Sequence, residues 1–268
     1  MSEFTVSRAG AELSGEEAGE GVPVVLLHGL TATRRYVVMG SRALERGGHR
    51  VVSYDARGHG RSSPAADYGY EALAADLLAV LDDRGIETAV LAGASMGAHT
   101  IVRLALDHGD RVAGLVLITP AYTPEGGDSD LERWDALADG LRNGGVEGFV
   151  AAYGDPQVPD AWRETVTKVL RQRLSAHRHP DAVADALNAV PRSRAFEDWS
   201  ELAELALPTL VVASRDEADP GHPYAVGERY AREIPDAELL SEEPGSSPLA
   251  WQGGQLSKAI AALAERAG

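Results

Sequence analysis

Residues 89–101 read Ala-Val-Leu-Ala-Gly-Ala-Ser-Met-Gly-Ala-His-Thr-Ile, and this stretch decides the fold. Its first residues, 89–91, form an apolar run of the kind found in a buried strand. Gly93-Ala94-Ser95-Met96-Gly97 follows at once, and from residue 98 the apolar positions recur at helical spacing. The two glycines let a strand and a helix approach closely. We therefore expect a strand, a tight strained turn that carries Ser95, and a helix.

Similar apolar runs lie on both sides of this stretch. They occupy residues 22–27, 51–54, 115–118 and 210–213, and each is typical of a strand that is buried on both faces. Helical spacing of apolar residues appears at 70–81 and 98–106. Strands that alternate with helices predict an α/β fold with a mostly parallel central sheet flanked by helices.

The alternation is interrupted between residues 119 and 207. Loop residues come first, and three or four short helical patterns follow. Asp130 is a candidate N-cap for the first of these helices. Two of these patterns cover residues 162–174 and 180–190. We interpret the interruption as a helical cap of residues 120–207, inserted into a core of residues 1–119 and 208–268.

Composition excludes several classes of function. The 268 residues carry a formal net charge of −16, which disfavours nucleic acid and anionic membranes as partners. The chain has no cysteine, begins without the pattern of a signal peptide, and has no apolar run of ~18 residues. No metal-ligand or phosphate-loop spacing occurs. These features predict a cytoplasmic protein that needs no cofactor or metal and acts on a small molecule; none bears on its oligomeric state.

A second motif supports the first. His28-Gly29-Leu30 ends the first buried strand and begins a loop. In an α/β fold with a serine on such a turn, a loop of this kind gives one backbone N–H to an oxyanion hole, and the residue after the serine gives the other. We assign these donors to Leu30 and Met96. We place His28 and Gly29 beside the substrate and interpret His28 as a residue that holds the loop rather than a proton carrier.

With these motifs the chain resembles the α/β-hydrolase superfamily, particularly its small esterases and enol-lactonase-like members. The resemblance covers nearly the whole chain, including the stretch Asp55-x-Arg57-Gly58-His59-Gly60-Arg61-Ser62, which in such proteins braces the loop beside the oxyanion hole. It implies that residues 93–97 are a nucleophile elbow. Serine at position 95, in place of aspartate, argues against the related dehalogenases and epoxide hydrolases.

The family pattern fails at the catalytic histidine. The expected order is Ser, then an acid, then His. Asp216, Glu217 and Asp219 compete for the acid after the strand at 210–213. The histidine should follow the last strand, around residues 237–240, but Ser246-Ser247 stands where Gly-His is expected, and no histidine follows His222.

The other histidines are poor substitutes, which leaves His222 as the candidate base. His49 and His108 belong to the opposite end of the sheet, His99 to a helix that leads away from Ser95, and His59 is a distant choice; His177 and His179 are expected to face solvent. Asp219-Pro220-Gly221-His222 has the central residues that a type II turn favours, which brings its ends within ~7 Å. Our hypothesis is a triad of Ser95, His222 and Asp219, with Asp216 as the alternative acid.

The remaining pocket residues and the function follow from this hypothesis. Tyr122, just after a core strand, and Trp251, in the loop that lacks the histidine, are candidates to line the pocket. The first functional hypothesis is a cofactor-independent serine hydrolase that acts on a small carboxylic ester or lactone through an acyl-enzyme on Ser95. The alternative is a non-hydrolytic protein on the same scaffold, either a small-molecule binder or a lyase or cyclase.

Overall fold

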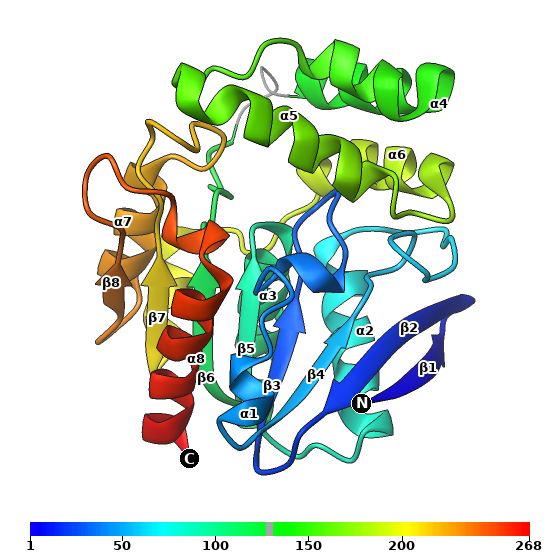
Figure 1. Cartoon of the computed structure of the whole chain (residues 1–268). Helices are drawn as coiled ribbons and strands as arrows, with labels where there is room; N and C mark the ends of the chain where they lie inside the picture. The colour runs from blue at the N-terminus through cyan, green and yellow to red at the C-terminus, as the bar shows by residue number, and fades with distance from the viewer. Residues whose placement is uncertain (127–130) are drawn as a thin grey trace.

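The structure, a computed structural model, describes residues 1–126 and 131–268, so the expected helix cap at Asp130 lies outside it. Within these ranges one eight-stranded sheet has the order β1-β2-β4-β3-β5-β6-β7-β8 (Figure 1). The strands are β1 Ser2–Arg8, β2 Ala11–Ala18, β3 Val22–Leu27, β4 His49–Tyr54, β5 Ala89–Ala94, β6 Val112–Ile118, β7 Thr209–Val212 and β8 Glu238–Leu240. The pairs β1–β2 and β2–β4 are antiparallel and the others are parallel, as the apolar runs predict.

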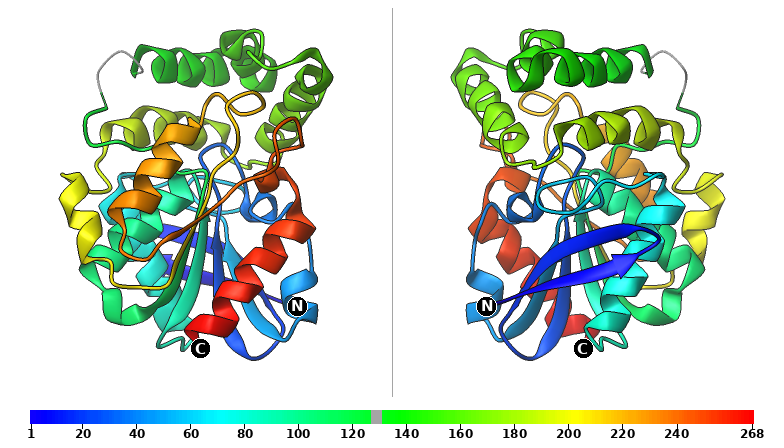
Figure 2. Two further views of the ribbon diagram at one scale, coloured as in Figure 1. Left: turned by 90° about the vertical axis from the view of Figure 1, so that its left-hand side faces the viewer. Right: turned by 90° about the vertical axis from the view of Figure 1, so that its right-hand side faces the viewer.

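Helices cover both faces of this sheet. One face packs against α2 (Tyr70–Asp83), α3 (Met96–Asp107) and α7 (Tyr224–Glu233), and the other against α1 (Ala43–Arg46) and α8 (Gly253–Ala267). Figure 2 shows α7 and α8 on opposite sides of the sheet. Neighbouring strand residues alternate between the two cores; Leu91, for example, packs with the first and Val90 with the second. The central strands are therefore buried on both faces, which explains their continuous apolar sequence.

Among the described residues between β6 and β7, three α-helices lie above the carboxyl ends of the parallel strands (Figure 1). They are α4 (Leu131–Tyr153), α5 (Asp160–Leu174) and α6 (Pro180–Ala189), and we call them the cap helices. They share a small apolar core that contains Leu137, Phe149, Leu174 and Leu187. The division of the chain into a core and a cap at residues 119/120 and 207/208 remains our proposal.

The longest cap helix is broken at one residue. Gly145 within α4 has a φ of 59°, outside the helical region, so the segment is two helices that meet at a kink. No helix in the two described ranges has the length and apolarity to cross a membrane.

Candidate active site

Ser95 occupies a strained turn between β5 and α3. Its φ of 49° and ψ of −113° are unusual for a residue with a side chain. Its N–H donates to the carbonyl of Ile118 (2.9 Å) and its carbonyl accepts from the N–H of His99 (3.1 Å). A Cβ at Gly93 would lie 2.3 Å from the carbonyl carbon of Gly97, so larger residues would force strand and helix apart. The turn is the one that the Gly-x-Ser-x-Gly spacing predicts, and Ser95 is partly exposed at its tip.

The loop after β3 lies directly against this turn. A Cβ at Gly29 would lie 3.3 Å from Cβ of Ser95. The carbonyl of Gly29 accepts from Nδ1–H of His28 (2.8 Å) and from the N–H of Ala32 (3.0 Å). In a trans peptide the following N–H, that of Leu30, points the opposite way. Within the described residues neither the Leu30 N–H nor the Met96 N–H has an acceptor, so both remain available for an oxyanion.

His28 is fully committed to holding this loop. Its Nε2 accepts a hydrogen bond from the N–H of Ala56 (2.9 Å), so the ring is neutral with its proton on Nδ1. Burial lowers the pKa of His28 to about 3. His28 therefore orients the Gly29–Leu30 peptide and has no nitrogen left for proton transfer.

Asp219 and His222 form a hydrogen-bonded pair on the loop between β7 and α7. Nδ1–H of His222 donates to Oδ1 (2.9 Å) and Oδ2 (3.0 Å) of Asp219. The backbone N–H of His222 also donates to the carbonyl of Asp219 (3.1 Å), which closes the predicted four-residue turn. The expected type II geometry is wrong, because Gly221 does not adopt the left-handed φ which that type requires.

The pair has the electrostatics of a base with its orienting acid. Burial disfavours a charged imidazole, but the charge of Asp219 and its hydrogen bond outweigh burial and raise the pKa of His222 above its usual value. The side chain of His222 is 28% exposed, and no described residue hydrogen-bonds its Nε2. Nε2 is therefore free to accept a proton.

His99, one turn after Ser95, is excluded as a base by its own hydrogen bonds. Its Nε2 accepts from the N–H groups of Ala121 and Tyr122 (both 3.0 Å), and its Nδ1 bonds the hydroxyl of Tyr70 (2.9 Å). Burial and the nearby charge of His222 lower the pKa of His99 to about 3. The side chain holds the segment after β6 in place.

His59 is also a poor base. Its Nδ1–H donates to the carbonyl of Arg57 (3.0 Å), while its buried Nε2 has no partner. Burial lowers the pKa of His59 well below its usual value.

Neither Asp216 nor Glu217, the alternatives to Asp219 as the catalytic acid, is paired with a histidine among the described residues. Asp216 is exposed and accepts from the N–H of Tyr224 (2.6 Å), so it caps the start of α7. Glu217 is exposed as well. The loop where the family histidine is expected is held by Glu242, which accepts from the N–H of Arg215 (2.6 Å) and of Leu249 (3.0 Å), and Ser246 in that loop is exposed.

The two predicted pocket aromatics are both in packing contacts. The hydroxyl of Tyr122 donates to the carbonyl of Phe196 (2.8 Å), so only its ring is available to a ligand. Trp251 ends a short 3₁₀ helix (Leu249–Trp251), and its ring meets that of Trp162 on α5 edge to face at 5.8 Å. Trp251 thus joins the loop before α8 to the cap helices.

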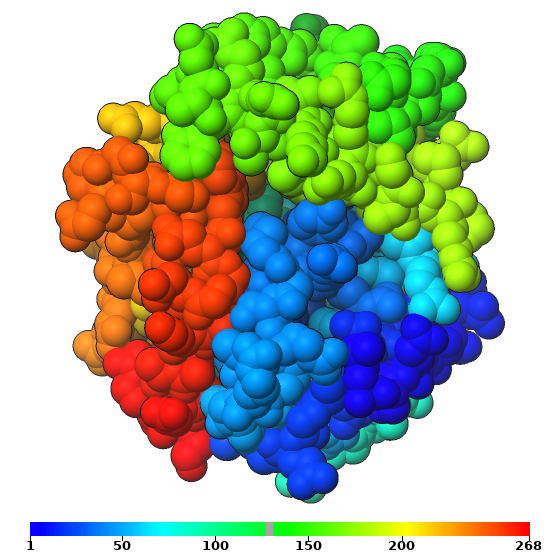
Figure 3. Space-filling view, viewed as in Figure 1, coloured from blue at the N-terminus to red at the C-terminus, as the bar shows by residue number. Residues whose placement is uncertain are grey.

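A polar seam joins the end of α5 to the core loops, which sequence reasoning missed. Arg173 donates through Nη2 to the carbonyl of Leu30 (2.9 Å) and to Oγ1 of Thr31 (3.0 Å). His177, expected in solvent, instead accepts from the N–H of Gly60 (2.8 Å) and donates to the carbonyl of Thr31 (3.0 Å). These partners lie more than a hundred residues away, so no local pattern signals them. Figure 3 shows a hollow beneath the cap helices, beside the core segments of this seam.

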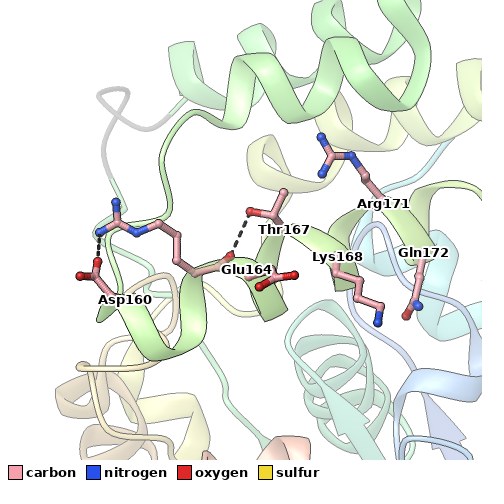
Figure 4. A pocket seen from close by; sticks show the side chains of 7 residues that line it. Asp160, Glu164, Thr167, Lys168, Arg171 and Gln172 are labelled. Atoms are coloured by element: carbon pink, nitrogen blue, oxygen red, sulfur yellow. Dashed lines mark hydrogen bonds and ion pairs between the residues drawn. The ribbon is translucent and has the colours of Figure 1, made fainter.

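A second concave surface lies away from these residues. A cavity of about 610 Å³ follows the outer face of α5 (Figure 4). Its lining residues are Asp160, Arg163, Glu164, Thr167, Lys168, Arg171 and Gln172. None of the predicted site residues belongs to it. Within the described residues no group of three or more His, Asp or Glu side chains is arranged to hold a metal ion.

The buried histidines predict sensitivity to acid. The pKa values of His28 and His99 are depressed to about 3 from 6.5, so their stabilising contribution is present above pH 6.5 and is lost as the pH falls towards 3. We expect the free energy of unfolding to fall from pH 6.5 to 4.5 by up to about 1.4 kcal/mol per pH unit for each such histidine. Urea unfolding across this range measures it. His179→Gln, an exposed control, should keep the slope, and a flat profile in the wild type contradicts the prediction.

Comparison with known proteins places the chain in a family. Residues 22–248 match the family model described as the alpha/beta hydrolase fold. "Putative carbamate hydrolase RutD" of Variovorax paradoxus is 32% identical over 231 residues, which is 85% of each chain.

Two solved structures cover nearly the whole chain. An esterase from Thermogutta terrifontis, solved with malate bound, is 27% identical with a TM-score of 0.81 and covers 100% of this chain and 99% of its own. The enol-lactonase from Burkholderia xenovorans LB400 is 25% identical with a TM-score of 0.77, and the match covers 97% of this chain and 99% of the other. The chain therefore belongs to the alpha/beta hydrolase fold family and is a hydrolase of that family.

Proposed function

We propose that the protein is a cofactor-independent serine hydrolase that opens a small carboxylic ester or lactone through an acyl-enzyme on Ser95. The observation that carries the proposal is the Asp219–His222 pair, which supplies an oriented imidazole with a free Nε2 in a chain that lacks the usual C-terminal histidine. The esterase and enol-lactonase among the similar structures favour the same substrate class.

The proposed chemistry uses side chains and backbone groups alone. Oγ of Ser95 attacks the carbonyl carbon while Nε2 of His222 takes the hydroxyl proton. The N–H groups of Leu30 and Met96 hold the resulting oxyanion. Collapse expels the alcohol oxygen, which takes the proton back from His222. Water then attacks the acyl carbon, His222 again serves as the base, and the carboxylic acid leaves.

Two measurements on the purified protein test the proposal directly. The first is turnover of p-nitrophenyl acetate and butyrate. The second is labelling with a fluorophosphonate, followed by mass spectrometry of the peptide that contains Ser95. We expect both turnover and a covalent adduct on Ser95, since the reagent reports an activated serine even where the ester is a poor substrate. Absence of both would refute the assignment of Ser95 as an activated nucleophile.

The loop at Ser246 and Ser247 supports a second candidate, a non-hydrolytic small-molecule binder or a lyase or cyclase. A family member without the C-terminal histidine has lost one part of the usual machinery. In that case a ligand would bind beneath the cap helices without acylating Ser95, and the fluorophosphonate would leave the protein unlabelled.

The pH dependence of turnover separates the candidate acids. Because the pKa of His222 is raised and the base must be neutral, kcat/KM should rise with pH and level off above pH 6.5. Asp219→Asn should move this inflection to lower pH and reduce kcat by about 10³- to 10⁴-fold. Asp216→Asn should weaken the start of α7 but keep the inflection. If Asp216→Asn shifts the inflection and Asp219→Asn does not, the acid is Asp216.

A further inference from the structure

Arg173 is a cation inside the seam between the cap helices and the core. Its Nη2 is committed to the carbonyl of Leu30 and to Thr31, and its Nε is buried without a partner. Nη1 is not among the fully buried unpartnered atoms, and no described residue accepts a hydrogen bond from it. No carboxylate of the described residues forms an ion pair with this guanidinium.

This arrangement leaves a positive charge only partly compensated. Burial lowers the pKa of Arg173, while the neighbouring Tyr36 and Asp219 oppose that effect. The carboxylate of Asp219 is already hydrogen-bonded to His222. A partly buried guanidinium without a paired anion is unfavourable, and an anionic ligand that completes its hydrogen bonds would relieve that cost.

Arg173 also lies next to the groups that the reaction uses. It bonds the carbonyl of Leu30, the residue whose N–H is the first oxyanion donor. Its positive charge acts to lower the pKa of both His28 and His222. Arg173 therefore lies near the oxyanion loop and near the loop that carries His222. A ligand whose carbonyl oxygen rests on the Leu30 N–H would therefore lie beside the residue that Arg173 holds.

We propose that Arg173 binds a carboxylate of the substrate, so that the natural ester or lactone carries an acid group on its acyl side. A single guanidinium next to the Asp219 carboxylate suits a monoanion better than a phosphate dianion. The proposal rests on the proposed function, because the reacting carbonyl is placed by Ser95 and Leu30.

Matched acidic and neutral esters test this assignment. The substrates are the monoethyl esters of succinic, glutaric and adipic acids, each beside the primary amide that replaces its free carboxylate by a neutral group of equal size. The readout is the ratio of kcat/KM for the acid to that for the amide. We expect the wild type to prefer the acid of at least one length by at least about tenfold. Arg173→Gln should reduce that preference by about 10- to 100-fold.

The ratio separates recognition from a merely structural role. Loss of the bonds to Leu30 and Thr31 disturbs the oxyanion loop for both esters alike and leaves the ratio unchanged. Arg173→Lys keeps the charge and should retain part of the preference, and it serves as the second variant if Arg173→Gln does not fold. Arg171→Gln is the control, since Arg171 pairs with Glu147 (2.8 and 2.9 Å) on the outer face of α5 (Figure 4).

A binding measurement distinguishes failure of this inference from failure of the proposed function. Calorimetric titration with succinate, glutarate and adipate, beside the matching monocarboxylates, needs no turnover. If a dicarboxylate binds and its affinity falls at least tenfold in Arg173→Gln, while no ester is hydrolysed and the fluorophosphonate does not label Ser95, the carboxylate site at Arg173 is kept and the hydrolase proposal is overturned. Turnover of acid and amide at equal rates, or an equal loss of both in Arg173→Gln, overturns the inference and keeps the hydrolase. Neither turnover nor binding overturns both.

Discussion

Ser95→Ala is expected to lower kcat/KM for p-nitrophenyl butyrate by about 10⁴- to 10⁶-fold, the range found when a triad nucleophile is removed. Alanine takes the same strained backbone position as Ser95, so the fold and the oxyanion donors should persist. What disappears is the attacking oxygen at the tip of the β5–α3 turn.

Two readouts make this result specific. The circular dichroism spectrum and melting temperature of Ser95→Ala should match those of the wild type, which excludes unfolding as the cause. Ser246→Ala removes an exposed serine from the loop where the family histidine is expected, and it should keep full activity. Retention of more than a tenth of the wild-type rate in Ser95→Ala would assign the nucleophile to another residue.

His222→Gln is expected to have the second largest effect, a fall of about 10³- to 10⁶-fold in kcat/KM. Glutamine keeps a polar side chain on the loop but offers no nitrogen that takes a proton at neutral pH. The pH dependence above pH 6.5 should disappear together with the rate, since it belongs to the imidazole.

The controls for His222→Gln are the other histidines. His179→Gln changes an exposed residue at the start of α6 and should leave turnover unchanged. His59→Gln removes a buried histidine whose Nε2 also has no partner. If His59→Gln abolishes turnover and His222→Gln does not, the base is His59, and the Asp219–His222 pair only closes its turn.

The fold could be predicted from the sequence because its signals are local. The run at 22–27 coincides with β3, because a strand buried on both faces is apolar throughout. Residues 70–81 lie within α2, because a helix buried on one face has its apolar residues at helical spacing. The tight turn at Ser95 follows equally from two glycines and the short-range approach of β5 and α3. The turn type at Pro220-Gly221 was predicted wrongly, which shows that residue preferences alone do not fix a turn type.

Only part of the candidate site could be predicted from the sequence. Asp219 and His222 are only three positions apart in the sequence, so their pairing was a local inference, and the hydrogen bonds to both carboxylate oxygens agree with it. Arg173 and His177 offered no such signal, because an arginine near the end of a helix and a histidine in a loop are ordinary surface residues until their distant partners are known. Both become informative only when the chain brings residues 30, 31 and 60 beneath the cap helices.

The seam at the end of α5 couples the position of this cap helix to the order of the oxyanion loop. The same hydrogen bonds that hold α5 down also fix the carbonyls of Leu30 and Thr31, so α5 cannot swing outward without releasing the loop that orients the Leu30 N–H. An open molecule would admit substrate and discharge product but would lack a rigid cradle for the oxyanion. The position of α5 and the order of the oxyanion loop are therefore coupled through the same two side chains, Arg173 and His177.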